Sequence, residues 1–130
     1  MCALNTVCEE CLYGIGMTEA QLVKYAYLGD VEMVKELLPR TNPRYDGNAA
    51  LLNACKYGHV EVVRLLLADP RTNPGARESL SLQWACENGH TEIVKLLLAS
   101  GKVNPEAENG YPFRIALRNR HLDIVKLFSP

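Results

Sequence analysis

The fold of this chain is decided by the stretch Ala54-Cys55-Lys56-Tyr57-Gly58-His59-Val60-Glu61-Val62-Val63-Arg64-Leu65-Leu66-Leu67. It consists of a small-residue pair, a glycine followed by histidine, and an apolar block that ends in leucines. The same order returns around Gly89, more loosely around Gly29, and around Arg120, where arginine replaces the glycine. These four marker positions are 29, 31 and 31 residues apart, and an Asn-Pro pair recurs at residues 42, 73 and 104. Repetition over most of a 130-residue chain indicates an internal structural repeat.

Each unit is predicted to be a pair of helices joined at the marker position. In the first helix, apolar or small residues recur at positions i, i+3 and i+4. The glycine ends this helix because it adopts the left-handed backbone conformation of a sharp turn without steric cost. The expected buried positions of the first helix are Leu51, Ala54, Cys55, Leu82, Ala85, Cys86, Phe113, Ala116 and Leu117. The second helix is expected to begin at Asp30, His59, His90 or His121 and to stop at Pro39, Pro70 or Gly101.

A helix pair of this kind cannot bury its apolar stripe alone, so the units are expected to stack into an all-α solenoid. Residues 1–17 are predicted to form an N-terminal capping helix. Thr18 and Gln21 have the spacing of a capping box that opens the first repeat helix. About four stacked repeats are predicted, at approximately residues 18–47, 48–78, 79–109 and 110–130.

The units, built as Ala-small-x-x-Gly-His-x-Glu-Val-Val-x-Leu-Leu-Leu, resemble the ankyrin repeat family over roughly residues 19–128. The resemblance implies an ankyrin-type helix-turn-helix solenoid. The family's opening Thr-Pro-Leu-His motif keeps its proline only in Tyr111-Pro112-Phe113. Units of 29 to 31 residues imply loops shorter than the family's projecting hairpin, and the linker Asp69-Pro70-Arg71-Thr72-Asn73-Pro74 is similar to ankyrin tracts of large DNA viruses and their protist hosts. The family's opening histidine, which ties adjacent repeats together, is replaced by Val23, Leu52, Gln83 and Arg114.

Composition excludes several classes of protein. Lys and Arg number 14 against 15 Asp and Glu, a net charge of −1, so no bulk electrostatic attraction to nucleic acid or to an anionic membrane is expected. Charged residues interrupt every leucine cluster, so no membrane span is predicted. The N-terminal residues lack the basic region of a signal peptide. Five cysteines without the spacing of a disulfide framework favour an intracellular, cytoplasmic location.

Charged residues on the second helices are expected to cancel one another. In each unit a basic residue follows an acidic residue by three positions, the spacing at which side chains on a helix meet. We therefore expect a solvated, charge-balanced outer face instead of a nucleic-acid track. The pairs are Glu32 with Lys35, Glu61 with Arg64, Glu92 with Lys95, and Asp123 with Lys126.

The histidines carry no predicted chemistry. His59, His90 and His121 occupy equivalent positions in successive units, about 8–10 Å apart in a helical stack. Ligands of one metal ion lie about 2 Å from a common point, so these three cannot share one. The serines lack the context of a catalytic nucleophile, and no phosphate-binding loop is present. The sequence predicts no catalytic residue, no metal ligand and no cofactor.

The cysteines are expected to be structural. Cys8 and Cys11 fall on the buried stripe of the predicted capping helix, and Cys55 and Cys86 on small core positions. An alternative hypothesis makes the chain a small zinc or thiol protein that uses Cys2 together with Cys8 and Cys11.

The first helices are expected to line a concave face that binds a protein partner. Opposite their buried positions, the residues differ from unit to unit while the core positions repeat. Tyr, Trp and Arg dominate interface energetics. Trp84 is either an anchor on this face or a half-buried packing residue. The predicted partner-binding residues are Tyr27, Tyr57, Trp84, Glu87, Asn88, Arg118 and Asn119, with Tyr45, Arg77 and Tyr111 from the loops.

The sequence therefore predicts a non-enzymatic protein–protein interaction module, most simply a monomer. As an alternative, the Leu127-Phe128 end lacks a polar cap and would mediate self-association or pack on further repeats of a longer parent chain.

Overall fold

Paired helices make up the whole described part of the computed structural model, which gives the backbone for residues 15–128 and the side chains for residues 19–128. No strand occurs in this part of the chain. The all-α solenoid predicted from the sequence is confirmed. The helix pairs are α2 (Ile15–Leu28) with α3 (Val31–Leu37), α4 (Tyr45–Tyr57) with α5 (Val60–Ala68), α6 (Ala76–Glu87) with α7 (Thr91–Ser100), and α8 (Ala107–Arg118) with α9 (Leu122–Leu127). A short 3-10 turn, η1 (Leu38–Arg40), follows α3.

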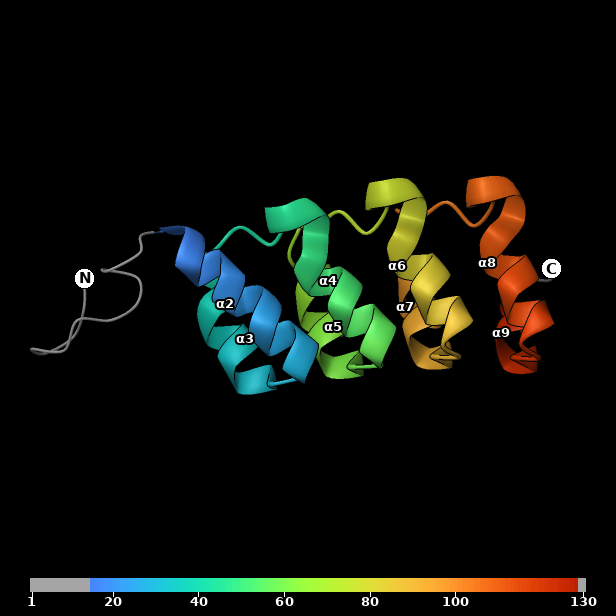
Figure 1. The fold of residues 1–130 in the computed structure, drawn as a ribbon, viewed down its shortest axis with the longest axis horizontal. Coiled ribbons are helices and arrows are strands. Elements are labelled where there is room, and N and C mark those ends of the chain that lie inside the picture. The colour runs from blue at the N-terminus through green and yellow to red at the C-terminus, as the bar shows by residue number, and fades with distance from the viewer. Residues whose placement is uncertain (1–14, 129–130) are drawn as a thin grey trace, which may run out of the picture.

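The four pairs, here called units 1 to 4, stand side by side in one row (Figure 1). The first helices of neighbouring units contact each other more extensively than the second helices do. This closer packing brings the first helices to the inner side of the stack. The core lies between the two layers and runs through all units, with fully buried Leu22, Leu51, Leu82, Val63, Val94 and Leu97 among its members.

The turn end, where each first helix meets its second helix, follows the prediction. Gly58 ends α4 with φ of 80°, and its N–H bonds back to the carbonyl of Ala54. Asp30 caps α3, because its carboxylate accepts a hydrogen bond from the N–H of Met33 at 3.2 Å. Histidines occupy the same N-cap position in α5, α7 and α9, but their side chains make no capping hydrogen bond.

The loop end, at the top of Figure 1, contains a feature that the sequence analysis did not predict. Three consecutive residues near the start of α4, α6 and α8 have left-handed backbone conformations. They form one left-handed turn that lies across the axis of the following helix. Left-handed backbone normally occurs at single residues, so a run of three is unusual. The residues are Asp46, Gly47 and Asn48; Arg77, Glu78 and Ser79; and Glu108, Asn109 and Gly110.

The Asn-Pro pairs shape the loops that lead into these turns. The side-chain oxygen of Asn42 accepts a hydrogen bond from the N–H of Arg44, and Asn73 and Asn104 do the same two residues ahead. This local bond closes an Asx turn. The periodic Asn-Pro pair of the sequence is therefore a loop-forming element in units 2 to 4.

Two sequence-based expectations are wrong. Thr18 lies inside α2, which begins at Ile15, so it does not cap the first repeat helix. Leu117 and Phe113 were expected to be buried, but Leu117 is 51% exposed and Phe113 is half-buried, because no further unit covers them within the described residues. The predicted capping helix falls mainly on residues 1–14, which lie outside the described part of the chain, and the predicted repeat limits remain predictions.

Candidate partner-binding surface

Three aromatic side chains predicted to bind a partner lie on the inner face, on three successive first helices. Tyr27 of α2 and Tyr57 of α4 meet edge to face, with ring centroids 4.9 Å apart and an interplanar angle of 85°. Their side chains remain 47% and 46% exposed. Trp84 of α6 is half-buried. We call Tyr27, Tyr57 and Trp84 the aromatic strip.

Lys56 joins the two halves of the aromatic strip. Its ammonium nitrogen lies 5.5 Å from the centroid of the Tyr57 ring and 5.0 Å from that of Trp84. A cation over a ring face at this distance is attracted by the ring quadrupole. Trp84 therefore packs at the junction of α4 and α6 and still presents part of its ring.

The remaining predicted residues of the inner face differ in what holds them. The amide of Asn88 donates to the carbonyl of Trp84 at 2.8 Å, and that of Asn119 donates to the carbonyl of Glu87 at 3.1 Å. Both amides thus satisfy backbone groups at helix ends. Glu87 and Arg118 are exposed, and neither side chain has a hydrogen bond or ion pair within the described residues.

Tyr45, Arg77 and Tyr111, the predicted loop residues, lie at the loop end and not in the aromatic strip. Arg77 donates to the carbonyl of Asp46 at 2.9 Å and lies 3.7 Å from its carboxylate. The guanidinium of Arg114 lies 5.8 Å from the ring centroid of Tyr111, which is half-buried. Tyr45 and Arg77 are thus separate from the aromatic strip, whereas Tyr111 lines a small pocket together with Arg118.

Histidines tie the units together at the turn end, a role that the sequence analysis missed. The Nε2 atoms of His59, His90 and His121 lie 2.8, 2.9 and 3.1 Å from the carbonyl oxygens of Tyr27, Lys56 and Glu87 in the preceding unit. A carbonyl only accepts, so Nε2 carries the proton. The recurrence of histidine directly after the marker position was the sequence signal from which this role could have been predicted.

The marker glycines have a second function in this contact. A Cβ atom on Gly89 would lie 2.8 Å from the ring of His121, and one on Gly58 would lie 2.7 Å from the ring of His90. The residue at this position must therefore lack a side chain as well as adopt the left-handed conformation. We call the three pairs of this kind, which include Gly29 with His59, the Gly–His ladder.

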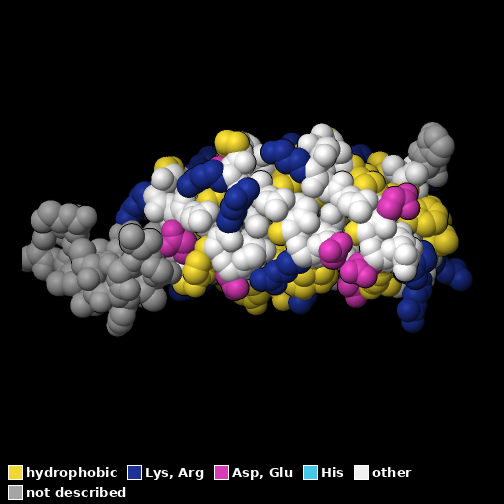
Figure 2. Space-filling model, turned by 90° about the horizontal axis from the view of Figure 1, so that it is seen from above, with side chains coloured by type: hydrophobic (Ala, Val, Ile, Leu, Met, Phe, Trp, Pro, Cys, Tyr) yellow, Lys and Arg dark blue, Asp and Glu magenta, His cyan; other side chains and the backbone are white. Residues whose placement is uncertain are grey.

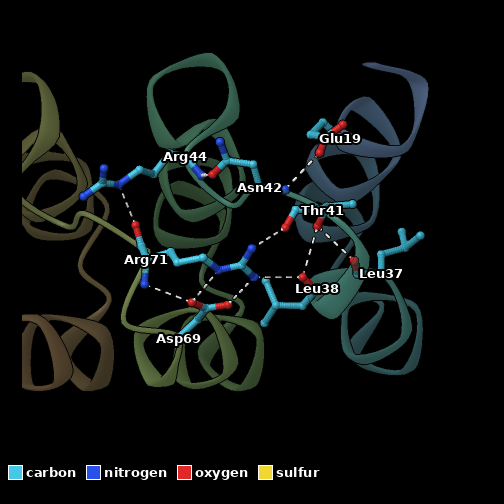
Figure 3. A network of polar contacts seen from close by, with 8 residues as sticks. All are labelled: Glu19, Leu37, Leu38, Thr41, Asn42, Arg44, Asp69 and Arg71. Atoms are coloured by element: carbon cyan, nitrogen blue, oxygen red, sulfur yellow. Dashed lines mark hydrogen bonds and ion pairs between the residues drawn. The ribbon is translucent and has the colours of Figure 1, made fainter. Parts of the chain in front are cut away.

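Arg71 holds the loops of units 1 and 2 together (Figure 3). Its guanidinium donates to the carbonyls of Thr41 at 2.8 Å and Leu38 at 3.1 Å, and to the carboxylate of Asp69 at 2.7 Å. Arg44 in turn donates to the carbonyl of Arg71 at 2.7 Å. The hydrogen bonds from Arg71 lower the pKa of Asp69 below its ordinary value of 3.8.

A second series of loop contacts repeats along the array. Near the start of α2, α4 and α6, a side-chain oxygen accepts a hydrogen bond from the N–H of the asparagine in the loop that follows the unit. Each bond closes its unit at the loop end, and the residue type changes while the contact persists. The pairs are Glu19 with Asn42 at 2.9 Å, Asn48 with Asn73 at 2.9 Å, and Ser79 with Asn104 at 2.8 Å.

The outer face carries the predicted ion pairs in three units. Glu32 with Lys35, Glu61 with Arg64, and Glu92 with Lys95 lie 3.7, 3.3 and 3.2 Å apart. At the loop end, basic and acidic side chains are interspersed (Figure 2). Neither the outer face nor the loop end carries charges of a single sign.

The described residues hold no cluster of metal-ligating side chains. No group of three or more His, Cys, Asp or Glu side chains is placed to hold a metal ion in this part of the chain. Cys55 and Cys86 are buried in the core, as predicted. Burial raises the pKa of the Cys86 thiol to about 12 and that of Cys55 further, which leaves both thiols unreactive. The cysteines of the zinc or thiol alternative lie outside the described residues.

None of the described helices is both long and apolar enough to cross a bilayer.

Comparison with known proteins agrees with the repeat geometry. The family model described as ankyrin repeats (3 copies) matches residues 2–78 and 71–129, which together cover nearly the whole chain. No curated protein matches the sequence well enough to serve as a relative. Proteins of the matched family generally act as protein–protein interaction modules and are typically not enzymes. With four stacked helix pairs, marker glycines in left-handed conformation and this match, the chain belongs to the ankyrin repeat family.

Proposed function

We propose that this protein is a non-enzymatic interaction module that holds a protein partner on its inner, first-helix face. The observation that carries the proposal is the aromatic strip, in which Tyr27 packs on Tyr57 and Lys56 joins Tyr57 to Trp84. Residues 57 positions apart in the sequence thus contribute to one surface. Family membership supports the general role, and the strip supports the choice of face.

The chemistry of the aromatic strip suits protein recognition. Tyrosine and tryptophan supply large contact area at a low cost in side-chain entropy and often act as hot spots. The two tyrosines are almost half exposed although they contact one another, so their edges remain available to a partner. Arg118, exposed on α8 of the same layer, extends the surface toward unit 4.

The partner is expected to meet a preformed surface. The strip residues lie on helices, and the Gly–His ladder holds those helices in register. A rigid scaffold reduces the entropy lost on binding. We also propose that the protein acts inside the cell, in the cytoplasm, since Cys55 and Cys86 are free thiols in its core.

A second candidate function is self-association through the C-terminal end. The exposure of Leu117 and Leu122, at 51% and 58%, favours it.

Affinity capture from a cell extract tests the proposed face with two matched variants. The first carries Ala at Tyr57, Trp84 and Arg118, and the second carries Ala at Arg64, Glu92 and Lys95 on the outer face. Both should keep the helical circular dichroism of the parent chain. We expect the inner-face variant to lose the proteins captured by the parent and the outer-face variant to retain them. Equal capture by both variants would contradict the proposal.

A further inference from the structure

The inner face differs in charge from the chain as a whole. Two positions of each first helix, two and five residues before the marker position, lie opposite the buried positions, and none of these eight side chains is fully buried. They form two rows across the four units, which follow one another along the stack (Figure 1). Three of the eight are basic and one is acidic, a net charge of +2 in a chain whose total is −1. The rows are Tyr27, Lys56, Glu87 and Arg118, and Lys24, Asn53, Trp84 and Ile115.

The basic residues of the inner face have no carboxylate partners. On the second helices of units 1 to 3, each basic residue pairs with a glutamate of its own helix at 3.2 to 3.7 Å. On the inner face, Lys56 lies over aromatic rings instead, and the ammonium of Lys24 lies 5.4 Å from the ring centroid of Tyr25. Neither these lysines nor Arg118 forms an ion pair within the described residues. The outer face neutralises its own charge, and the inner face leaves positive charge for a bound molecule.

Positive charge and apolar surface lie next to each other at two places on the inner face. The ammonium of Lys56 lies 5.5 and 5.0 Å from the centroids of two rings of the aromatic strip. In unit 4, Arg118 lines a small pocket of about 80 Å³ together with Tyr111 and Ile115. A carboxylate bound to either cation makes a charge-assisted hydrogen bond, and an apolar side chain beside that carboxylate meets a ring.

Glu87 favours a protein segment over a nucleic acid at this surface. It lies between Lys56 and Arg118 in the same row, and its exposed carboxylate has no hydrogen bond or ion pair within the described residues. A nucleic acid carries a negative charge at each nucleotide and would be repelled there. A protein segment avoids the repulsion, because its acidic residues can be spaced to miss Glu87.

We propose that the inner face binds an acidic segment of its protein partner, with carboxylates opposite Lys56 and Arg118 and apolar side chains on the aromatic strip. The inference rests on the proposed function, because it names the class of partner for the same face. Packed helices lie about 8–10 Å apart, and an extended segment advances about 3.3 Å per residue. Acidic residues about six positions apart therefore match the cations of units 2 and 4.

Fluorescence polarisation of a labelled peptide tests the charge preference with the full chain. The twelve-residue probe has two glutamates six positions apart, each followed by a leucine, with serine and glycine at the other positions. A second peptide has glutamine in place of both glutamates. We expect the glutamate peptide to bind about tenfold more tightly than the glutamine peptide, and this advantage to shrink as salt is added.

Two charge reversals on the inner face should act in opposite directions. Lys56→Glu should weaken binding of the glutamate peptide about tenfold, and Glu87→Lys should strengthen it about threefold. The second variant removes no contact, so its effect reports charge alone. The matched controls are Lys35→Glu and Glu32→Lys on the outer face, and both should bind the peptide as the parent does.

The outcomes separate this inference from the proposed function. Equal binding of the two peptides, no binding of either, or changes of the same sign in Lys56→Glu and Glu87→Lys would overturn the acidic preference. Tighter binding of a twelve-nucleotide uridine RNA would overturn the choice of a protein segment. Loss of the captured proteins in the inner-face alanine variant would still leave the inner face as the binding surface. Retention of those proteins by that variant overturns the proposed function itself, whichever peptide binds.

Discussion

At the turn end of the array, three junctions repeat one contact: a histidine ring packs on a left-handed glycine and bonds to a carbonyl of the preceding unit. At the loop end, the contacts differ from junction to junction. Arg71 bridges units 1 and 2, whereas Lys102 occupies the corresponding position at the junction of units 2 and 3. The turn end therefore sets the spacing of the stack, and the loop end is where individual units diverge.

The difference follows from the space available. At the turn end, the chain passes from one helix to the other over two or three residues, and the next unit packs directly on that turn. Little besides glycine fits there, so the contact is the same in each junction. The loops are longer and partly solvated, and backbone groups there find partners in several ways. Glu19, Asn48 and Ser79 show this, since three residue types make the same bond.

Breaking the Gly–His ladder should have the largest effect. Gly89→Ala adds both left-handed strain and a collision with the ring of His121, and should lower the free energy of unfolding by about 3 kcal/mol. Gly101 is the matched control, because it is equally left-handed but has no atom within 4 Å of an added Cβ. Gly101→Ala should cost about 1 kcal/mol. Urea denaturation followed by circular dichroism measures both, and equal losses would show that the ring contact contributes nothing.

The loop threonines sharpen the comparison, because equivalent residues there have different partners. The hydroxyl of Thr41 donates to the carbonyl of Leu37 at 2.9 Å, whereas that of Thr72 is buried without a hydrogen-bond partner in the described residues. Thr41→Val should destabilise the protein by about 1 kcal/mol. Thr72→Val should be neutral or stabilising, since Val103 already occupies the same position in the next loop. A loss of stability in the second variant equal to that in the first would contradict this account.

The left-handed turn of unit 3 should respond to relief of strain. Glu78 is left-handed with φ of 57°, and its counterpart in unit 2 is Gly47. Glu78→Gly should raise the free energy of unfolding by about 0.5–1 kcal/mol, the strain removed less the added entropy of the unfolded chain. Ser79→Gly relieves the same strain but removes the acceptor of the Asn104 N–H, so it should bring no gain. The midpoint of urea denaturation distinguishes the two variants.

The ion pair of Arg71 and Asp69 should have the smallest effect and a defined pH dependence. The pKa of Asp69 is lowered in the folded state, so its contribution to stability is complete above the ordinary value of 3.8 and is lost as the pH falls through the lowered value. Asp69→Asn should cost about 0.5 kcal/mol at neutral pH, as expected for an exposed pair. Thermal unfolding from pH 7 to pH 2 should show the parent and the variant converging in acid. A difference that stayed constant over this range would exclude the ion pair as its cause.

Much of the fold followed from local pattern. Ala54 and Cys55 precede Gly58 at a fixed spacing, and the leucines follow it at another. Both spacings extend over only a few helical turns, and together they predict the helices, the turn and the core. The left-handed turns were missed because Arg77, Glu78 and Ser79 are ordinary residues with no local preference for that conformation. The prediction for Leu117 was wrong because the repeat pattern assigns it a buried position, whereas its burial depends on a following unit that would cover it.

The candidate surface was predicted less completely. Residue type marked Tyr27, Tyr57 and Trp84 as anchors, but nothing in the sequence shows that they meet or that Lys56 lies between two of the rings. The same reasoning grouped Tyr45, Arg77 and Tyr111 with them, although these lie at the loop end. Residue types show which side chains are able to act as anchors, and distances between units show which of them act together.

The sequence by itself determined the period of the array, the helix pairs and the residues that make the core. Each depends on neighbours within one or two helical turns, which the periodicity of apolar residues and the positions of glycine and proline record directly. Only the tertiary structure decided which carbonyl each histidine meets, how Arg71 joins two loops and which aromatic rings share one face. Those contacts join residues about 30 positions apart, and their geometry depends on how far and at what angle one unit is displaced from the next.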